Sequence, residues 1–247
     1  MRTANIPALN IAPIASVVEG ARRFAARNGL ATRDHWDYSR VVVSPESVEK
    51  IAAAYEALPF MDNGAPAAWR AMAEETARQF EFMTAPESAG GMGITVTIED
   101  TDPYDVTKGG TRAFFDDVTN GRMRVLGTAN TGGHFMFGDD VNDMFRAVHD
   151  VFGHCGTGRG VDRHGEEAAF RKHSLMFSPL ARKALATETR GQNHAMIRAG
   201  GEFQPQKIAV LPHWARDFRT VAPTTLADYR KTLKQAAAFH AAQGLDA

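Results

Sequence analysis

Residues 141–154 read VNDMFRAVHDVFGH, and this stretch decides how the rest of the chain is interpreted. Its apolar side chains recur at i, i+3, i+4, i+7, i+10 and i+11: Val141, Met144, Phe145, Val148, Val151 and Phe152. This spacing predicts an amphipathic α-helix that buries one face. We expect Asp139 or Asp140 to cap the first turn of that helix.

Two histidines, His149 and His154, lie near the end of the predicted helix. On a straight α-helix, residues five apart point about 140° away from each other, so both imidazoles cannot reach one ion. We expect Gly153 to end the helix, because glycine tolerates the left-handed conformation of a helix terminus. The turn would then carry His154 back toward His149, so the sequence predicts that both bind a metal ion. The alternative is a pair of structural histidines.

A glutamate further along the chain, Glu188, is the third candidate ligand. The serine–proline pair at 178–179 is a typical helix start, and Glu188 falls on the apolar side of a helix that we expect to end at Gly191. A carboxylate on an apolar face needs a cation or several hydrogen-bond donors. We therefore predict that Glu188 completes the metal site, with Glu166 or Glu167 as alternatives.

The composition is that of an ordinary globular protein. The 247 residues are 44% hydrophobic and 23% charged, which is sufficient for one substantial core. The formal net charge of −1 argues against a nucleic-acid-binding protein. No apolar run approaches the length of a membrane span, about 18 residues. The single cysteine, Cys155, excludes an internal disulfide and fits a reducing compartment, so we expect a cytoplasmic protein.

Helical patterns outnumber strand patterns along the chain. Besides the two helices above, helices are predicted at 17–28, 45–58, 66–83, 111–118, 165–177 and 225–243, and strands at 94–98 and 122–126. The expected fold class is therefore mostly α with a minor β-sheet (α+β). We expect a single domain over 1–247. It would comprise a helical and small-sheet part at 1–130, a metal-site core at 131–215 and a C-terminal helix at 216–247.

Two histidines and one carboxylate that leave other positions open form the ligand set of non-haem iron(II) oxygenases, and the same set can hold catalytic zinc. The chain here resembles the aromatic amino acid hydroxylases, which carry His-Glu-x-x-Gly-His and then a glutamate ligand on a later helix. The motif reads HDVFGH in this chain, and Glu188 follows His154 by 34 residues. GEFQ at 201–204 and the stretch from Lys207 to Pro212 are similar to the family's next segments. The resemblance covers about residues 134–213.

The resemblance implies an aromatic amino acid hydroxylase-like catalytic core that binds Fe(II) through His149, His154 and Glu188. The activity implied is that of an iron-dependent monooxygenase, with dioxygen and a small molecule as substrates. We expect Glu202 and Asp150 to assist as hydrogen-bonding groups beside the metal.

Three departures from the family bear on cofactor and substrate. The family uses a pterin, but the sequence upstream of residue 131 contains no recognisable pterin-binding segment. Ala184 stands where the family holds its substrate against a tryptophan, and His134 stands near the position of the arginine that binds the substrate carboxylate. The resemblance therefore supports the iron centre more directly than an aromatic substrate or a pterin.

Two other functions fit the same residues. In HD-type metal-dependent phosphohydrolases, a histidine, a His-Asp dipeptide and a distant aspartate hold the metal ions. Here His134 would be the first ligand, His149 and Asp150 the dipeptide, and Asp217 or Asp228 the last ligand. A non-catalytic protein stabilised by its metal is the second alternative.

Overall fold

The computed structural model describes residues 8–30, 37–108, 110–131, 133–217 and 234. The first half of this chain forms α1 (Ala15–Arg27), α2 (Pro45–Glu56), α3 (Pro66–Thr84), β1 (Thr95–Glu99), α4 (Gly110–Thr119) and β2 (Arg122–Leu126). The second half forms α5 (Asp139–Val148), η6 (His149–Cys155), α6 (Arg163–Ser174), α7 (Ala181–Leu185), η7 (Ala186–Gly191), α8 (Gln192–Arg198) and α9 (His213–Arg216). Four short 3₁₀ turns, η2 to η5, cover Tyr38–Arg40, Glu87–Ala89, Val106–Lys108 and Thr128–Thr131.

These elements confirm a mostly α fold with a minor sheet. Each helix or strand predicted between residues 17 and 177 is present. Apart from the helix that carries the two histidines, the ends of these elements are shifted by at most three residues. The C-terminal helix predicted at 225–243 lies outside the described residues, except for Lys234. The helices of the described chain do not combine the length and apolar character that a membrane span requires.

The sheet consists of β1 and β2, which pair in parallel with Thr95 opposite Arg122 and Glu99 opposite Leu126. Parallel neighbours cannot be joined by a hairpin, and α4 provides the crossover between them. The buried side chains of β2, Met123 and Val125, pack into the largest hydrophobic cluster of the protein.

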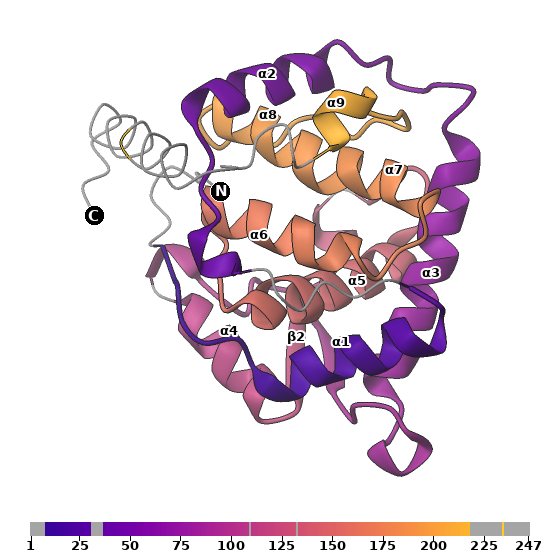
Figure 1. The fold of residues 1–247 in the computed structure, drawn as a ribbon, viewed down its shortest axis with the longest axis vertical. Helices are drawn as coiled ribbons and strands as arrows, with labels where there is room; N and C mark the ends of the chain where they lie inside the picture. Colours follow the sequence, from indigo (N-terminus) through magenta and orange to yellow (C-terminus); the bar gives the residue numbers. More distant parts are fainter. Residues whose placement is uncertain (1–7, 31–36, 109, 132, 218–233, 235–247) are drawn as a thin grey trace.

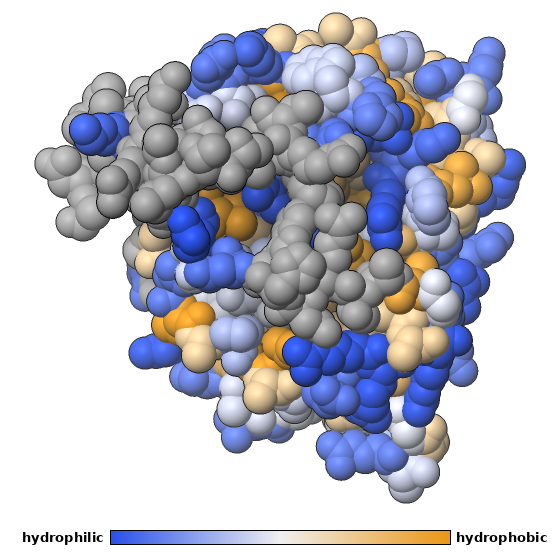
Figure 2. Space-filling model, in the orientation of Figure 1, coloured by the Kyte–Doolittle hydropathy of each residue, from blue (hydrophilic) through white to orange (hydrophobic). Residues whose placement is uncertain are grey.

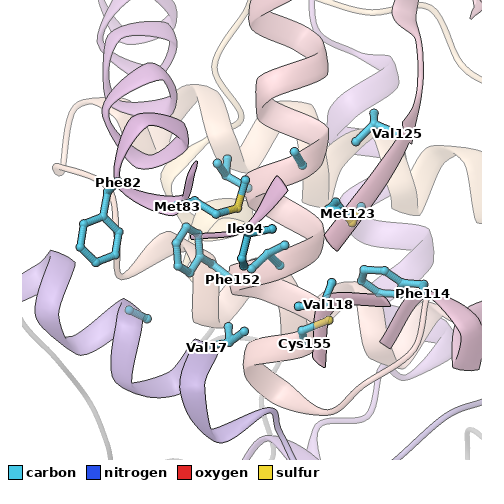
Figure 3. Close-up of a cluster of buried hydrophobic side chains, with 14 of the residues drawn as sticks. Val17, Phe82, Met83, Ile94, Phe114, Val118, Met123, Val125, Phe152 and Cys155 are labelled. Atoms are coloured by element: carbon cyan, nitrogen blue, oxygen red, sulfur yellow. The ribbon is translucent and has the colours of Figure 1, made fainter. Parts of the chain in front are cut away.

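That cluster joins sequence segments that lie far apart. Figure 3 shows side chains from α1, α3, α4, β2 and η6 converging on it with Ile94, which directly precedes β1; among them are Val17, Met83, Phe114 and Phe152. Residues of the predicted N-terminal part and of the predicted metal-site core therefore share one hydrophobic core.

Figure 1 shows the arrangement around this core, with α5 and α6 near the centre, α1 and α4 on one side and α2 and α8 on the other. The face in Figure 2 is covered mostly by polar and charged side chains, with hydrophobic ones scattered among them.

One predicted helix start is confirmed, and another is wrong. The hydroxyl of Ser44 accepts a hydrogen bond from the Ser47 backbone N–H (3.2 Å) at the start of α2. The predicted caps of α5, Asp139 and Asp140, lie instead in its first turn, and Gly138 occupies the N-cap with φ +73°. Glycine accepts this conformation readily, and the two acids still favour the positive end of the helix dipole.

The prediction that Gly153 ends the histidine helix is also wrong. The chain continues from α5 into η6, a π-helix, and first adopts a left-handed conformation at Gly158 (φ +72°). The i→i+5 hydrogen bonds of a π-helix bring residues five apart onto nearly the same side. His149 and His154 therefore approach each other within the helix, without a turn.

Gly153 instead allows two helices to approach closely. A Cβ at this position would lie 3.0 Å from the Cβ of Ala169 on α6 and 3.3 Å from its Cα. Gly191 likewise does not end its helix, since η7 continues into α8; a Cβ there would lie 2.7 Å from the ring of Tyr55.

We expect Gly153→Ala to lower the free energy of unfolding by about 1–3 kcal/mol, because the added methyl group meets the backbone of α6. Gly156→Ala is the matched control, since its Cβ would meet nothing closer than 3.7 Å in an ordinary helical conformation. That control should be neutral or up to about 1 kcal/mol more stable. Urea denaturation of both variants checks this, and equal stability of the two would contradict the packing role of Gly153.

Candidate metal centre

Three side chains from η6 and α6 bring potential metal ligands together: His149, His154 and Glu166. One ligand atom from each lies within 4.8 Å of the other two. Glu166 Oε1 is 3.6 Å from His154 Nε2, and Glu166 Oε2 is 3.9 Å from His149 Nε2. The two imidazole rings are nearly perpendicular, with their centroids 5.3 Å apart. The two histidines that the sequence singles out therefore lie side by side, with Glu166 next to them.

The helices that carry these residues pack directly against each other near the middle of the molecule (Figure 1). Asp162 begins α6 by accepting hydrogen bonds from the backbone N–H groups of His164 (2.9 Å) and Gly165 (3.4 Å). Glu166 consequently lies in the first turn of α6. Asn193 of α8 donates a hydrogen bond to Glu166 Oε2 (2.8 Å), which fixes the direction of the carboxylate.

The protonation of His154 leaves one nitrogen free to bind a metal. Its Nδ1 lies 3.1 Å from the carbonyl oxygens of both Arg159 and Gly160. Carbonyl oxygens only accept, so Nδ1 carries the proton and Nε2 holds the lone pair. That lone pair is on the atom nearest to Glu166.

Burial keeps both imidazoles neutral. Desolvation lowers the pKa of His149 to about 4 and also lowers the pKa of His154. Desolvation raises the pKa of Glu166, and His154 and Asn193 act in the opposite direction. Since neutral imidazole is the form that binds metals, the two histidines are ready ligands near pH 7.

The donor set fits a divalent transition metal. The Nε2 atom of His149 is buried and has no hydrogen-bond partner in the described chain, which is costly for a polar atom unless something binds it. Ligands about 2.1 Å from one ion lie roughly 3–3.5 Å apart, slightly closer than the separations found here. His149, His154 and Glu166 would therefore have to move slightly closer together to bind one ion.

A pocket of about 310 Å³ opens onto this cluster and includes His149 and Glu166 in its wall. Most of its other lining is apolar or aromatic, including Tyr104, Phe114 and Phe145. Mostly apolar walls with a few polar groups at one end are typical of small-molecule sites.

Asp150, a predicted site residue, also lines this pocket. Burial and the neighbouring Glu166 raise its pKa to about 8, although Arg146 acts in the opposite direction.

The structure places Glu188 elsewhere. It lies in the π-helix η7, where its Oε1 accepts a hydrogen bond from Gln206 (3.3 Å) and lies 3.5 Å from His134 Nε2. His134 Nδ1 accepts from the backbone N–H groups of Met136 and Phe137, so Nε2 carries the proton and faces the carboxylate. Glu188 thus has nearby hydrogen-bond donors of its own, and it is absent from the His149 cluster.

The remaining predicted residues also lie away from the cluster. Glu167 points to the other side of α6 and pairs with Arg190 and Arg171. Glu202 is exposed, although its neighbour Phe203 lines the pocket mouth. Ala184, which stands where the resembled family has a tryptophan, is buried in a hydrophobic cluster and does not line the pocket.

The ligand set of the phosphohydrolase alternative is not assembled in the described residues. His134 faces Glu188, as described above. The charge of Asp217 raises the pKa of Arg190, and Asp217 does not belong to the His149 cluster. Asp228 lies outside the described residues.

Sequence reasoning overlooked two buried residues beside His149, namely His173 and Gln79. A signal was present, because His173 follows Glu166 by seven residues and so lies on the same face of the predicted helix.

Comparisons with models of known protein families, with curated proteins and with solved structures found no match. The resemblance to the aromatic amino acid hydroxylases thus rests on the short motifs quoted above. The carboxylate beside the two histidines, Glu166, follows His154 by only 12 residues, in contrast to the family's later glutamate.

Proposed function

We propose that this protein is a non-haem iron(II) enzyme that oxidises a small organic substrate with dioxygen, using His149, His154 and Glu166 as metal ligands. One observation carries the proposal: two neutral imidazoles and one carboxylate converge beside a largely apolar pocket. Two histidines and one carboxylate with open positions form the ligand set of non-haem iron oxygenases. Bound iron would supply the activation of dioxygen.

The side chains of the protein itself would bind the substrate and hold the metal ligands in position. A substrate bound against the largely apolar wall of the pocket would displace water from the reacting groups, which strengthens electrostatic interactions there. Asn193 holds Glu166 in one orientation. Asp150 follows His149 directly in the chain and lines the same pocket.

Oxygen uptake tests this proposal. Metal-free protein would be loaded with iron(II) without oxygen and then mixed with aromatic amino acids and a tetrahydropterin, or with ascorbate in its place. We expect substrate-dependent oxygen uptake that His154→Ala abolishes. In a parallel arm with nucleotides and manganese, phosphate release without oxygen uptake in any mixture would favour the phosphohydrolase alternative. The pterin arm also shows whether a pterin is the reductant.

A further inference from the structure

A chain of hydrogen-bonding groups leads from a backbone carbonyl to the candidate ligand His149. Gln79 Nε2 donates to the Met176 carbonyl oxygen (3.1 Å), and Gln79 Oε1 lies 2.8 Å from His173 Nε2. His173 Nδ1 lies 3.1 Å from His149 Nδ1. Gln79 and His173 are completely buried, so water does not compete for these hydrogen bonds. α3 contributes the glutamine, α6 the second histidine and η6 the candidate ligand.

Each hydrogen bond in this chain sets the direction of the next. The Met176 carbonyl only accepts, so the amide nitrogen of Gln79 faces it and the amide oxygen faces His173. That oxygen also only accepts, so His173 carries its proton on Nε2 and accepts at Nδ1. His149 must therefore donate from Nδ1.

The consequence is that the lone pair of His149 lies on Nε2. This is the buried atom without a hydrogen-bond partner, 3.9 Å from Glu166. Ring packing restricts the same imidazoles, because Phe145 stacks on His149 at 5.7 Å and Phe177 meets the ring of His173 at 4.9 Å.

We propose that Gln79 and His173 are positioning residues that fix the tautomer and the ring orientation of His149 for metal binding. The inference rests on the proposed metal centre. Metal-bound histidines commonly donate their second N–H to a carboxylate, a carbonyl or water. Here a second imidazole accepts that hydrogen bond, and a glutamine amide decides which way the imidazole is protonated.

Three single variants separate this role from general packing. Gln79→Met removes the acceptor but keeps an unbranched side chain of similar length. Gln79→Glu keeps an oxygen that accepts from His173 whether or not the carboxyl is protonated. Thr76→Val is the matched control, because Thr76 also lies on α3 and is as deeply buried as Gln79. Its hydroxyl has no hydrogen-bond partner among the described residues.

Zn²⁺ and Co²⁺ titrations measure the effect on binding. We expect Gln79→Met to weaken the Kd by about 10- to 100-fold, as losses of outer hydrogen-bond partners typically do. Gln79→Glu and Thr76→Val should stay close to the wild type. The visible spectrum of bound Co²⁺ should change in Gln79→Met alone. A Kd and spectrum unchanged in Gln79→Met would overturn the proposal.

Long-range ¹H–¹⁵N NMR of the histidine rings tests the tautomers in the metal-free protein. We expect a proton on Nδ1 of His149 and on Nε2 of His173, and loss of this pattern in Gln79→Met. A proton on Nε2 of His149 in the wild type would also overturn the proposal. Because this measurement needs no metal, it distinguishes the two inferences. The expected tautomers in a protein that binds neither ion would overturn the metal centre, and with it the role in metal binding, but not the hydrogen-bond directions.

Discussion

Glu166→Ala is expected to abolish stoichiometric iron(II) binding, whereas Glu188→Ala is expected to retain it. The reason is geometric: a Glu166 oxygen lies within 4.8 Å of the ligand nitrogens of His149 and His154, and Glu188 lies against His134 and Gln206. The wild-type protein should bind about one equivalent of iron, as one such centre requires. Anaerobic titration followed by metal analysis gives the stoichiometry of each variant, with circular dichroism as the check that it has folded.

Glu166→Ala and Glu188→Ala should also differ in how a chelator changes their Tm. A ligand that binds only the folded state at 100 times its Kd stabilises by about 2.7 kcal/mol. For a protein of this length, that corresponds to a shift of roughly 5–10 °C in Tm. A chelator should therefore lower the Tm of the wild type and of Glu188→Ala, but not that of Glu166→Ala. The reverse pattern would show that the third ligand is the later glutamate, as the hydroxylase resemblance implies.

The sequence was informative about elements and about the pair of histidines, because both depend on local spacing. The apolar stripe of residues 141–152 predicts α5, and the five-residue separation of His149 and His154 marks them as a pair. The π-helical geometry that brings the two histidines together was not predictable from local spacing. Within the π-helix, Gly153 lies close against Ala169 of α6, and that contact crosses between two helices.

The choice between Glu166 and Glu188 as the third candidate ligand was also not predictable from local spacing. Glu166 and Glu188 each lie on a partly apolar helix, and local spacing does not reveal which helix packs against η6. In the fold, α6 occupies that place, and Asn193 turns Glu166 toward the histidines. Gln79 lies 94 residues from His173 along the chain, so their hydrogen bond leaves no mark in local sequence.

Arg190→Met is expected to lower the free energy of unfolding by up to about 3–5 kcal/mol, the typical cost of breaking a buried ion pair by removing one partner. Arg190 is 1% exposed and donates to both oxygens of Glu167, at 2.8 and 2.9 Å. Its other hydrogen bond goes to the Ala215 carbonyl (2.8 Å), so one side chain joins α6, η7 and α9. Arg171 also donates to Glu167 (2.8 Å).

Chemical denaturation of Arg190→Met beside Glu46→Ala measures this effect. Glu46 pairs with Lys50 on the surface, where both side chains are more than 60% exposed. Exposed pairs of this kind contribute about 0.5 kcal/mol or less, so the control should lose little. Equal losses in the two variants would contradict a structural role for the buried pair.

The pH dependence of stability gives a second, independent measure of this pair. Burial alone would raise the pKa of Glu167, but Arg190 and Arg171 outweigh it and hold the pKa at about 2. The unfolded chain, with an ordinary value of 4.5, therefore takes up its proton first as the pH falls. The stabilisation is complete above about pH 5 and is lost toward pH 2, by about 3 kcal/mol at 1.4 kcal/mol per pH unit. Glu167→Gln cannot take up that proton, so its stability should fall less steeply over this range. If the wild type and Glu167→Gln lose stability in parallel between pH 5 and pH 3, the ionised Glu167 does not hold α6 against η7.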